Sequence, residues 1–83
     1  MPADKLTIRS VLREHGRLSQ DADLIGEEAD LYKSGLTSHA SVNVMLALES
    51  LFDIEFPDHL LKRSVFSSIE TIHRAVSELH ASS

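Results

Sequence analysis

The chain has 83 residues, and its 13 acidic and 8 basic side chains give a formal net charge of −5. This length fits one domain, residues 1–83, and the acidity argues against nucleic-acid binding, because a clustered basic face supplies most of that affinity. There is no cysteine, no apolar run near the roughly 20 residues that span a bilayer and no signal-peptide core, so we expect a cytoplasmic protein without disulfides or membrane insertion.

The first predicted helix covers residues 5–15. Ile8 and Leu12 lie four residues apart, which predicts that they share one buried face. Asp4 is placed to cap the beginning of this helix, and Gly16 is placed to end it.

Residues 16–36 show no sustained hydrophobic period and contain all 3 glycines. A loop of about 20 residues is unusual in a small domain and is often functional. We expect this loop to pack through Leu24, Leu31 and Leu36, with a short turn around Glu27–Leu31.

The most regular helical pattern covers residues 38–52. Val44, Leu48 and Leu51 are spaced to lie on one face, and either Thr37 or Ser38 can cap the beginning. Pro57 prevents a simple continuation of this helix.

Two further helical segments complete the chain. Residues 58–63 predict a short helix with Leu60 and Leu61 facing inward, and Ser67 and Glu70 form a capping box for the last helix. The apolar face of that last helix contains Phe66, Ile69, Ile72, His73, Val76 and Leu79. The predicted fold is therefore all-α: a small bundle of three main helices and one short helix, with a long structured first loop.

The segment GLTSHASVNVMLALESLFDIEFPD, residues 35–58, resembles the central stretch of acyl carrier proteins. Gly35-Leu36 and Ser38 precede a helix that runs through an Ala-Leu-Glu element to Phe-Asp-Ile-Glu-Phe-Pro. Glu49 follows Ser38 by eleven residues, which is the family's spacing between this glutamate and its modified serine. The resemblance implies a carrier without catalytic activity, with 4'-phosphopantetheine from coenzyme A attached to Ser38 by a phosphopantetheinyl transferase.

The local sequence by itself leaves the role of Ser38 open. A serine at the beginning of a helix is commonly an ordinary N-cap. The unpaired N–H groups and the helix dipole at the same place also favour an anion, such as a phosphodiester on the Ser38 oxygen. The resemblance favours the carrier, and the alternative is an unmodified helical protein–protein interaction domain.

The helix after Ser38 departs from typical fatty-acid carriers. Thr37 and His39 replace the usual Asp and Leu, and neutral residues stand where acids would be expected: Ala40, Asn43 and Ser50. The pattern from Gly35 to Glu49 is similar to that of aminoacyl carrier proteins, so the cargo is either an acyl group or an amino acid. We expect partners to contact Thr37, His39, Val42, Asn43 and Glu49.

The resemblance also implies partners and a place for cargo. An acyl- or amino acid–carrier protein ligase would load the monomeric carrier, and a downstream acyltransferase or synthase would accept the cargo. A long acyl chain would need an apolar cleft between helices. The residues predicted to line it are Leu36, Val44, Leu48, Phe52, Ile54, Phe66, Ile69 and Ile72.

The sequence gives no pattern for catalysis or metal binding. The 5 histidines show neither the HxxxH nor the HExxH spacing. Ser38 and His39 are adjacent, which directs their side chains differently, and a GxSxG motif is absent. We therefore expect no metal site and no catalytic residue.

Overall fold

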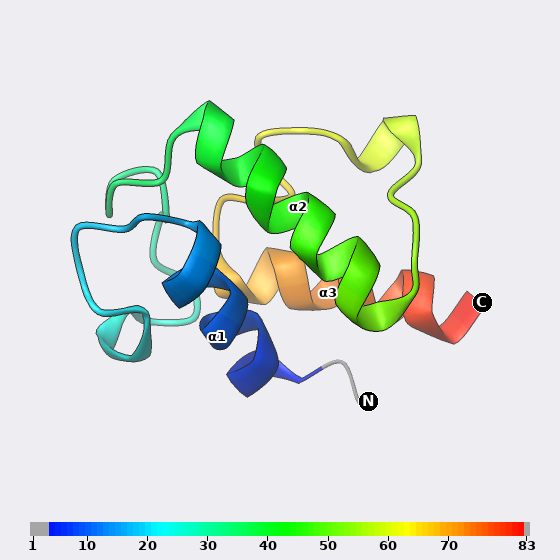
Figure 1. The fold of residues 1–83 in the computed structure, drawn as a ribbon, viewed down its shortest axis with the longest axis horizontal. Coiled ribbons are helices and arrows are strands. Elements are labelled where there is room, and N and C mark those ends of the chain that lie inside the picture. The colour runs from blue at the N-terminus through cyan, green and yellow to red at the C-terminus, as the bar shows by residue number, and fades with distance from the viewer. Residues whose placement is uncertain (1–3, 83) are drawn as a thin grey trace.

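The computed structural model describes residues 4–82 (Figure 1). Within this range the elements are α1 (Lys5–His15), η1 (Ala22–Leu24), α2 (Ser38–Phe52), η2 (Asp58–Leu60) and α3 (Ile69–Ser82), where η denotes a 3₁₀ turn. The described part of the chain contains no strand, which confirms the predicted all-α fold. None of its helices combines the length and apolarity that crossing a membrane requires.

Helix α1 forms as the sequence predicts. The Asp4 carboxylate accepts a hydrogen bond of 2.8 Å from the Thr7 N–H. Hydrogen bonding to the Thr7 side chain, together with this backbone bond, holds the pKa of Asp4 below its ordinary value. Ile8 and Leu12 are fully buried. At the other end the Gly16 N–H donates to the Leu12 carbonyl, so the helix ends where Gly16 begins the loop.

The long loop packs, but partly through other residues than expected. Leu31 and Leu36 are buried, whereas Leu24 is 82% exposed, so its prediction as an anchor was wrong. The Asp21 carboxylate accepts from the Asp23 N–H and begins a turn at Ala22–Leu24. This 3₁₀ turn is additional to the predicted turn around Glu27–Leu31, where the Ala29 N–H donates to the Gly26 carbonyl at 3.1 Å. Ile25 is buried in place of Leu24.

Main-chain hydrogen bonds hold the loop against the rest of the bundle. The Leu31 N–H donates to the Ser67 carbonyl at 2.7 Å, and the Glu70 N–H donates to the Glu27 carbonyl at 2.9 Å. The Arg9 guanidinium adds bonds of 2.6 and 2.7 Å to two further loop carbonyls, those of Ala22 and Ile25. The loop is thus a fixed part of the fold that leads into the beginning of α2.

Helix α2 buries one face, at a spacing of four residues: Ala40, Val44, Leu48 and Phe52. Leu51, expected on this face, is 40% exposed because it falls outside that spacing. The helix ends at Asp53, whose backbone is left-handed, with φ 54° and ψ 51°. The Glu49 carboxylate accepts from the Phe56 N–H at 2.8 Å, which turns the chain back toward the bundle.

The segment between α2 and α3 differs from the prediction in two ways. Its helical part is a 3₁₀ turn, Asp58–Leu60, without a side-chain cap from Asp58. Leu60 is half-buried and packs on the core, but Leu61 is 47% exposed, so its predicted inward orientation was wrong. The turn is only three residues long, and the chain leaves it before Leu61 could complete a buried helical face.

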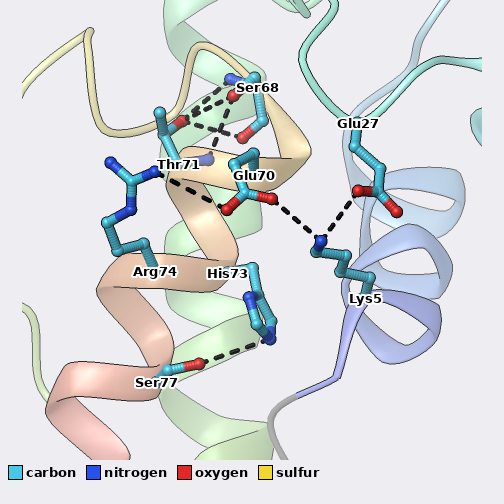
Figure 2. Close-up of polar contacts among 8 residues, drawn as sticks. All are labelled: Lys5, Glu27, Ser68, Glu70, Thr71, His73, Arg74 and Ser77. Carbon is cyan, nitrogen blue, oxygen red and sulfur yellow. Dashed lines mark hydrogen bonds and ion pairs between the residues drawn. The ribbon is translucent and has the colours of Figure 1, made fainter.

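The capping box of α3 is shifted by one residue from the predicted Ser67–Glu70 pair (Figure 2). The Ser68 hydroxyl accepts from the Thr71 N–H, and the Thr71 hydroxyl accepts from the Ser68 N–H, both at 3.1 Å. This shift leaves Glu70 free to face α1, where its carboxylate lies 2.9 Å from the Lys5 ammonium. Lys5 also lies 2.8 Å from Glu27, so one cation joins α1, the loop and α3.

The core lies where α1 packs against α2 and α3 and the loop covers them. Burial of apolar side chains is the main favourable contribution to folding in a domain of this size. The large side chains that are fully buried come from α1, the loop, α2 and α3, and they are Ile8, Leu12, Leu31, Val44, Leu48, Ile69, Ile72 and Val76.

Candidate functional site

Ser38 is the first residue of α2 and is exposed. Thr37, not Ser38, is the N-cap: its hydroxyl accepts from the Ala40 N–H at 3.0 Å. Within residues 4–82 the Ser38 hydroxyl makes no hydrogen bond, while its carbonyl accepts from the Ser41 hydroxyl at 2.7 Å. Of the two capping residues that the sequence allowed, the structure uses Thr37, and the Ser38 oxygen remains accessible for chemistry.

The beginning of α2 suits a negative charge. The first N–H groups of a helix have no partner within it, and the helix dipole places positive potential there. The first turn of α2 contains no acidic residue that would neutralise this potential. A phosphate ester on Ser38 would therefore lie at a favourable end of the helix.

A groove with a volume of about 280 Å³ opens beside Ser38. It forms because the chain after α2 returns alongside the first half of that helix, as the yellow segment in Figure 1 shows. We call it the Ser38 groove and define it by its lining residues: Tyr32, Ser38, Ser41, Val42, Met45, Leu61, Lys62, Arg63 and Phe66.

Tyr32 and Arg63 fix one side of the Ser38 groove. The Arg63 guanidinium carbon lies 3.8 Å from the centroid of the Tyr32 ring, a cation–π contact. The Tyr32 hydroxyl donates to the Arg63 carbonyl at 3.2 Å. Burial raises the pKa of Tyr32, an effect that the nearby Arg63 charge partly opposes, so the hydroxyl stays a neutral donor at pH 7.

The residues predicted to line a cargo cleft lie mainly in the core. Phe66 lines the Ser38 groove, and Ile54 is half-buried against the core. The other predicted residues are buried core side chains: Leu36, Val44, Leu48, Phe52, Ile69 and Ile72. Entry of cargo among them stays a prediction, because in this structure they pack against one another.

Of the residues that line the Ser38 groove, the sequence predicted Ser38, Val42 as a partner contact and Phe66 as a cleft residue, and the others were missed, although part of the groove had a signal. Ser41, Val42 and Met45 follow Ser38 by three, four and seven residues, the spacing of one helix face. That spacing could have identified them. Leu61, Lys62 and Arg63 gave no such signal, because they approach Ser38 only through the return of the chain after α2.

The predicted partner-binding residues fall into two groups. Thr37, His39, Val42 and Asn43 are exposed at the beginning of α2. Glu49 is half-buried, and its carboxylate is bonded to the Phe56 N–H. Two further features were not predicted: Leu46 is 52% exposed on α2, and Ala40, which the sequence suggested as a replaced surface acid, is buried.

The described residues contain no group of three or more His, Cys, Asp or Glu side chains that could hold a metal ion. The site is therefore built from one accessible hydroxyl, a helix N-terminus and a groove. These parts can hold and present a covalently attached group.

No family model matches the chain, but individual proteins do. The aminoacyl carrier protein of Agrobacterium fabrum (strain C58 / ATCC 33970) is 53% identical over 70 residues, which cover 84% of this chain and 84% of that protein. Aminoacyl carrier protein 1 of Bradyrhizobium diazoefficiens is 41% identical over 49 residues, 59% of this chain and 54% of that protein.

Solved structures resemble this chain in both fold and sequence. One is a carrier protein from Agrobacterium tumefaciens in complex with an engineered Bradyrhizobium japonicum glycine:[carrier protein] ligase and AMP. It matches with a TM-score of 0.85 and 51% identity over 88% of this chain and 97% of that one. A solution structure from Agrobacterium tumefaciens matches with a TM-score of 0.72 and 49% identity over 90% of both chains.

The relatives are carriers, and in the crystallised complex the enzyme is the ligase. The identity to the Agrobacterium fabrum protein extends over most of both chains, and the structural agreement with the carrier in the ligase complex likewise covers most of both chains. This chain belongs to the aminoacyl carrier protein family.

Proposed function

We propose that this protein carries an amino acid as a thioester on a 4'-phosphopantetheine arm attached to Ser38. The chain has no cysteine, so the arm would supply the thiol that forms the thioester. The observation that carries the attachment site is the capping of α2 by Thr37, which leaves the Ser38 hydroxyl exposed and without a hydrogen bond in the described residues.

The surroundings of Ser38 fit a phosphodiester. The first turn of α2 contains no acid, and the cations Lys62 and Arg63 lie on the same groove as Ser38. A phosphopantetheinyl transferase would therefore meet an accessible hydroxyl in positive potential. The chain itself contributes attachment and positioning, and no general base.

An amino acid is favoured over a long acyl chain as the cargo. The relatives are aminoacyl carriers, and one was crystallised with a glycine:[carrier protein] ligase and AMP. We propose that a ligase of this class loads the present protein and that an acyltransferase or synthase later accepts the amino acid. Thr37, His39, Val42 and Asn43 are proposed as the contacts for these enzymes, since they are exposed near Ser38.

Intact-mass measurement after coexpression with a transferase tests the attachment. The wild type and Ser41→Ala should each gain one phosphopantetheine, and Ser38→Ala should gain none. Ser41 is the matched control because it lies on the same groove three residues away. A wild type that gains no mass would contradict the carrier role and favour an unmodified interaction domain.

A loading assay on the modified protein tests the cargo. We expect amino acids, offered with ATP and a glycine:[carrier protein] ligase, to form a hydroxylamine-sensitive bond to the arm. Fatty acids offered with an acyl–carrier protein ligase should be attached poorly. The reverse preference would leave the protein a carrier but make its cargo an acyl group.

A further inference from the structure

The Ser38 groove has an apolar floor and a cationic rim. Val42, Met45, Leu61 and Phe66 contribute apolar surface, and Lys62 and Arg63 contribute two adjacent positive charges. Val42 and Leu61 are respectively 50% and 47% exposed, so this apolar surface is open to solvent. The arrangement suits a ligand with one anionic end and a long, weakly polar body.

The two cations form no ion pair with an acid of the described residues. The ion pairs of Lys5, Arg13 and Arg74 use acids elsewhere, and Lys62 and Arg63 take part in no ion pair among residues 4–81. Arg63 is also held in place by its contact with the Tyr32 ring. Two adjacent cations beside Ser38, of which Arg63 is held in place by Tyr32, suit an anionic ligand.

We propose that the Ser38 groove is the docking site of the phosphopantetheine arm in its unloaded form, with Lys62 and Arg63 binding the phosphodiester. This inference rests on the proposed attachment to Ser38. We choose the arm as the occupant because its attachment residue, Ser38, lines the same groove as both cations. The body of the arm then lies against Val42, Met45 and Leu61. Without the arm, a partner would have to cover this apolar surface.

The lining also determines how docking responds to loading. None of the nine lining residues is acidic. The α-ammonium of an attached amino acid has an ordinary pKa of about 7.7–8.0, so most of it is charged at pH 7. In the groove this ammonium would meet two cations and apolar surface without a compensating acid. Loading with an amino acid therefore weakens docking and leaves the loaded end outside the groove for its partner.

Nuclear magnetic resonance of ¹⁵N-labelled protein tests the docking site. Ser38 is first modified to completion, as verified by intact mass, and the spectra of the modified and unmodified forms are compared. We expect shifts of the Tyr32, Met45 and Leu61–Phe66 amides in addition to those next to Ser38. Lys62→Gln with Arg63→Gln should reduce these distant shifts at least twofold, and Lys33→Gln, an exposed cation outside the groove, should not.

A nitroxide label on the arm gives an independent readout. The chain lacks cysteine, so the arm carries the only thiol and the label is specific. Paramagnetic broadening should be concentrated on the Ser38 groove in the wild type and should spread evenly over the surface in the double variant. The ³¹P resonance of the arm should become less sensitive to salt in that variant, because the phosphate has lost its cationic partners.

Loading completes the test. Glycine on the arm should move the groove amides back toward their unmodified positions, and N-acetylglycine, which lacks the ammonium, should leave them shifted. If the modified wild type shows changes only next to Ser38, the docking site is disproved while the attachment stands. If Ser38 accepts no phosphopantetheine, both the docking site and the proposed function fail.

Discussion

At the scale of single residues, the neighbours Thr37 and Ser38 divide two tasks. The Thr37 hydroxyl caps α2 through the Ala40 N–H, and the Ser38 hydroxyl is left without an intramolecular bond in the described residues. A serine used as the cap would become a weaker acceptor for that bond once its oxygen was esterified. Keeping the two tasks on different side chains would let the proposed arm be attached without loss of the cap.

Substitution of each residue should separate the tasks. Thr37→Ala should lower the free energy of unfolding by about 1 kcal/mol, because the cap is lost, and Thr37→Ser should retain most of it. Ser38→Ala should change stability little and abolish modification. Urea unfolding and intact mass measure the two effects, and a Ser38→Ala variant as destabilised as Thr37→Ala would show that Ser38 is the cap.

The left-handed residue Asp53 gives a second prediction at this scale. Its φ of 54° is costly for a β-branched side chain, by about 1–2 kcal/mol, and costs glycine nothing. We expect Asp53→Val to destabilise by that amount and Asp53→Gly to be as stable as the wild type or slightly more so. Chemical unfolding of both variants is the measurement, and equal stability of the two would contradict the left-handed C-cap of α2.

At the scale of elements, the beginning of α3 depends on a capping box that is one residue later than the sequence suggested. Ser68→Ala removes the hydroxyl that accepts from the Thr71 N–H and leaves this N–H without that partner at a buried position. The substitution should therefore lower the free energy of unfolding by about 1 kcal/mol. Ser67→Ala, whose hydroxyl donates to the Ser64 carbonyl instead, should cost less. Thermal unfolding of the two variants distinguishes the Ser68–Thr71 box from the predicted Ser67–Glu70 box. If Ser67 and Glu70 formed the box, Ser67→Ala would be the more destabilised of the two variants.

The Lys5 contacts make the association of α1, the loop and α3 dependent on pH. The bond from Lys5 lowers the pKa of Glu70, and the bonds to Glu27 and Glu70 raise the pKa of Lys5. The lowered pKa of the Glu70 carboxyl stabilises the fold at pH values above about 4.3, and this stabilisation is lost as the pH falls. The raised pKa of Lys5 stabilises the fold at pH values below about 10.4, and this stabilisation is lost as the pH rises.

The melting temperature of wild type should therefore exceed that of Lys5→Gln by a constant amount between these limits. We expect the difference to shrink below the lower limit and above the upper one, and to shrink with salt at neutral pH. Lys33→Gln, whose lysine forms no ion pair among residues 4–81, is the control and should show no such profile. A pH-independent difference would mean that Lys5 acts through packing alone.

Local patterns predicted the elements better than the contacts between them. The cap and buried face of α1 were correct because they involve residues within four positions of one another. The predicted burial of Leu24 and Leu61 was wrong because Leu24 ends one short 3₁₀ turn and Leu61 directly follows another, where a shift of one residue changes the direction of the side chain. The Ser38 groove could be predicted only on its α2 side, since the other side depends on how the chain returns.

At the scale of the whole molecule, the interior is already closed. The predicted cleft residues pack with one another in the core, and the Ser38 groove offers about 280 Å³ beside it. Inserting a long alkyl chain into a well-packed interior would force its side chains apart. Cargo of this carrier is therefore expected to remain outside the core.

A series of loaded proteins tests this expectation. Glycyl, acetyl, hexanoyl and dodecanoyl forms should unfold at similar temperatures, within about two degrees, since none gains a buried site. The unloaded modified protein is the reference. A melting temperature that climbs steadily with chain length would show that the bundle opens and that Leu36, Val44, Leu48 and their neighbours do line a cleft.

The attachment of the long loop by main-chain bonds has a consequence for how such a carrier can diversify. The bonds from Leu31 to Ser67 and from Glu70 to Glu27 use backbone atoms that every residue except proline possesses, so substitution of side chains on the loop surface leaves them intact. Exposed positions such as Glu28, Ala29 and Lys33 can therefore change freely. The loop leading to Ser38 is in this sense a ready-made randomisation site, where a library could alter the choice of ligase at little risk to the fold.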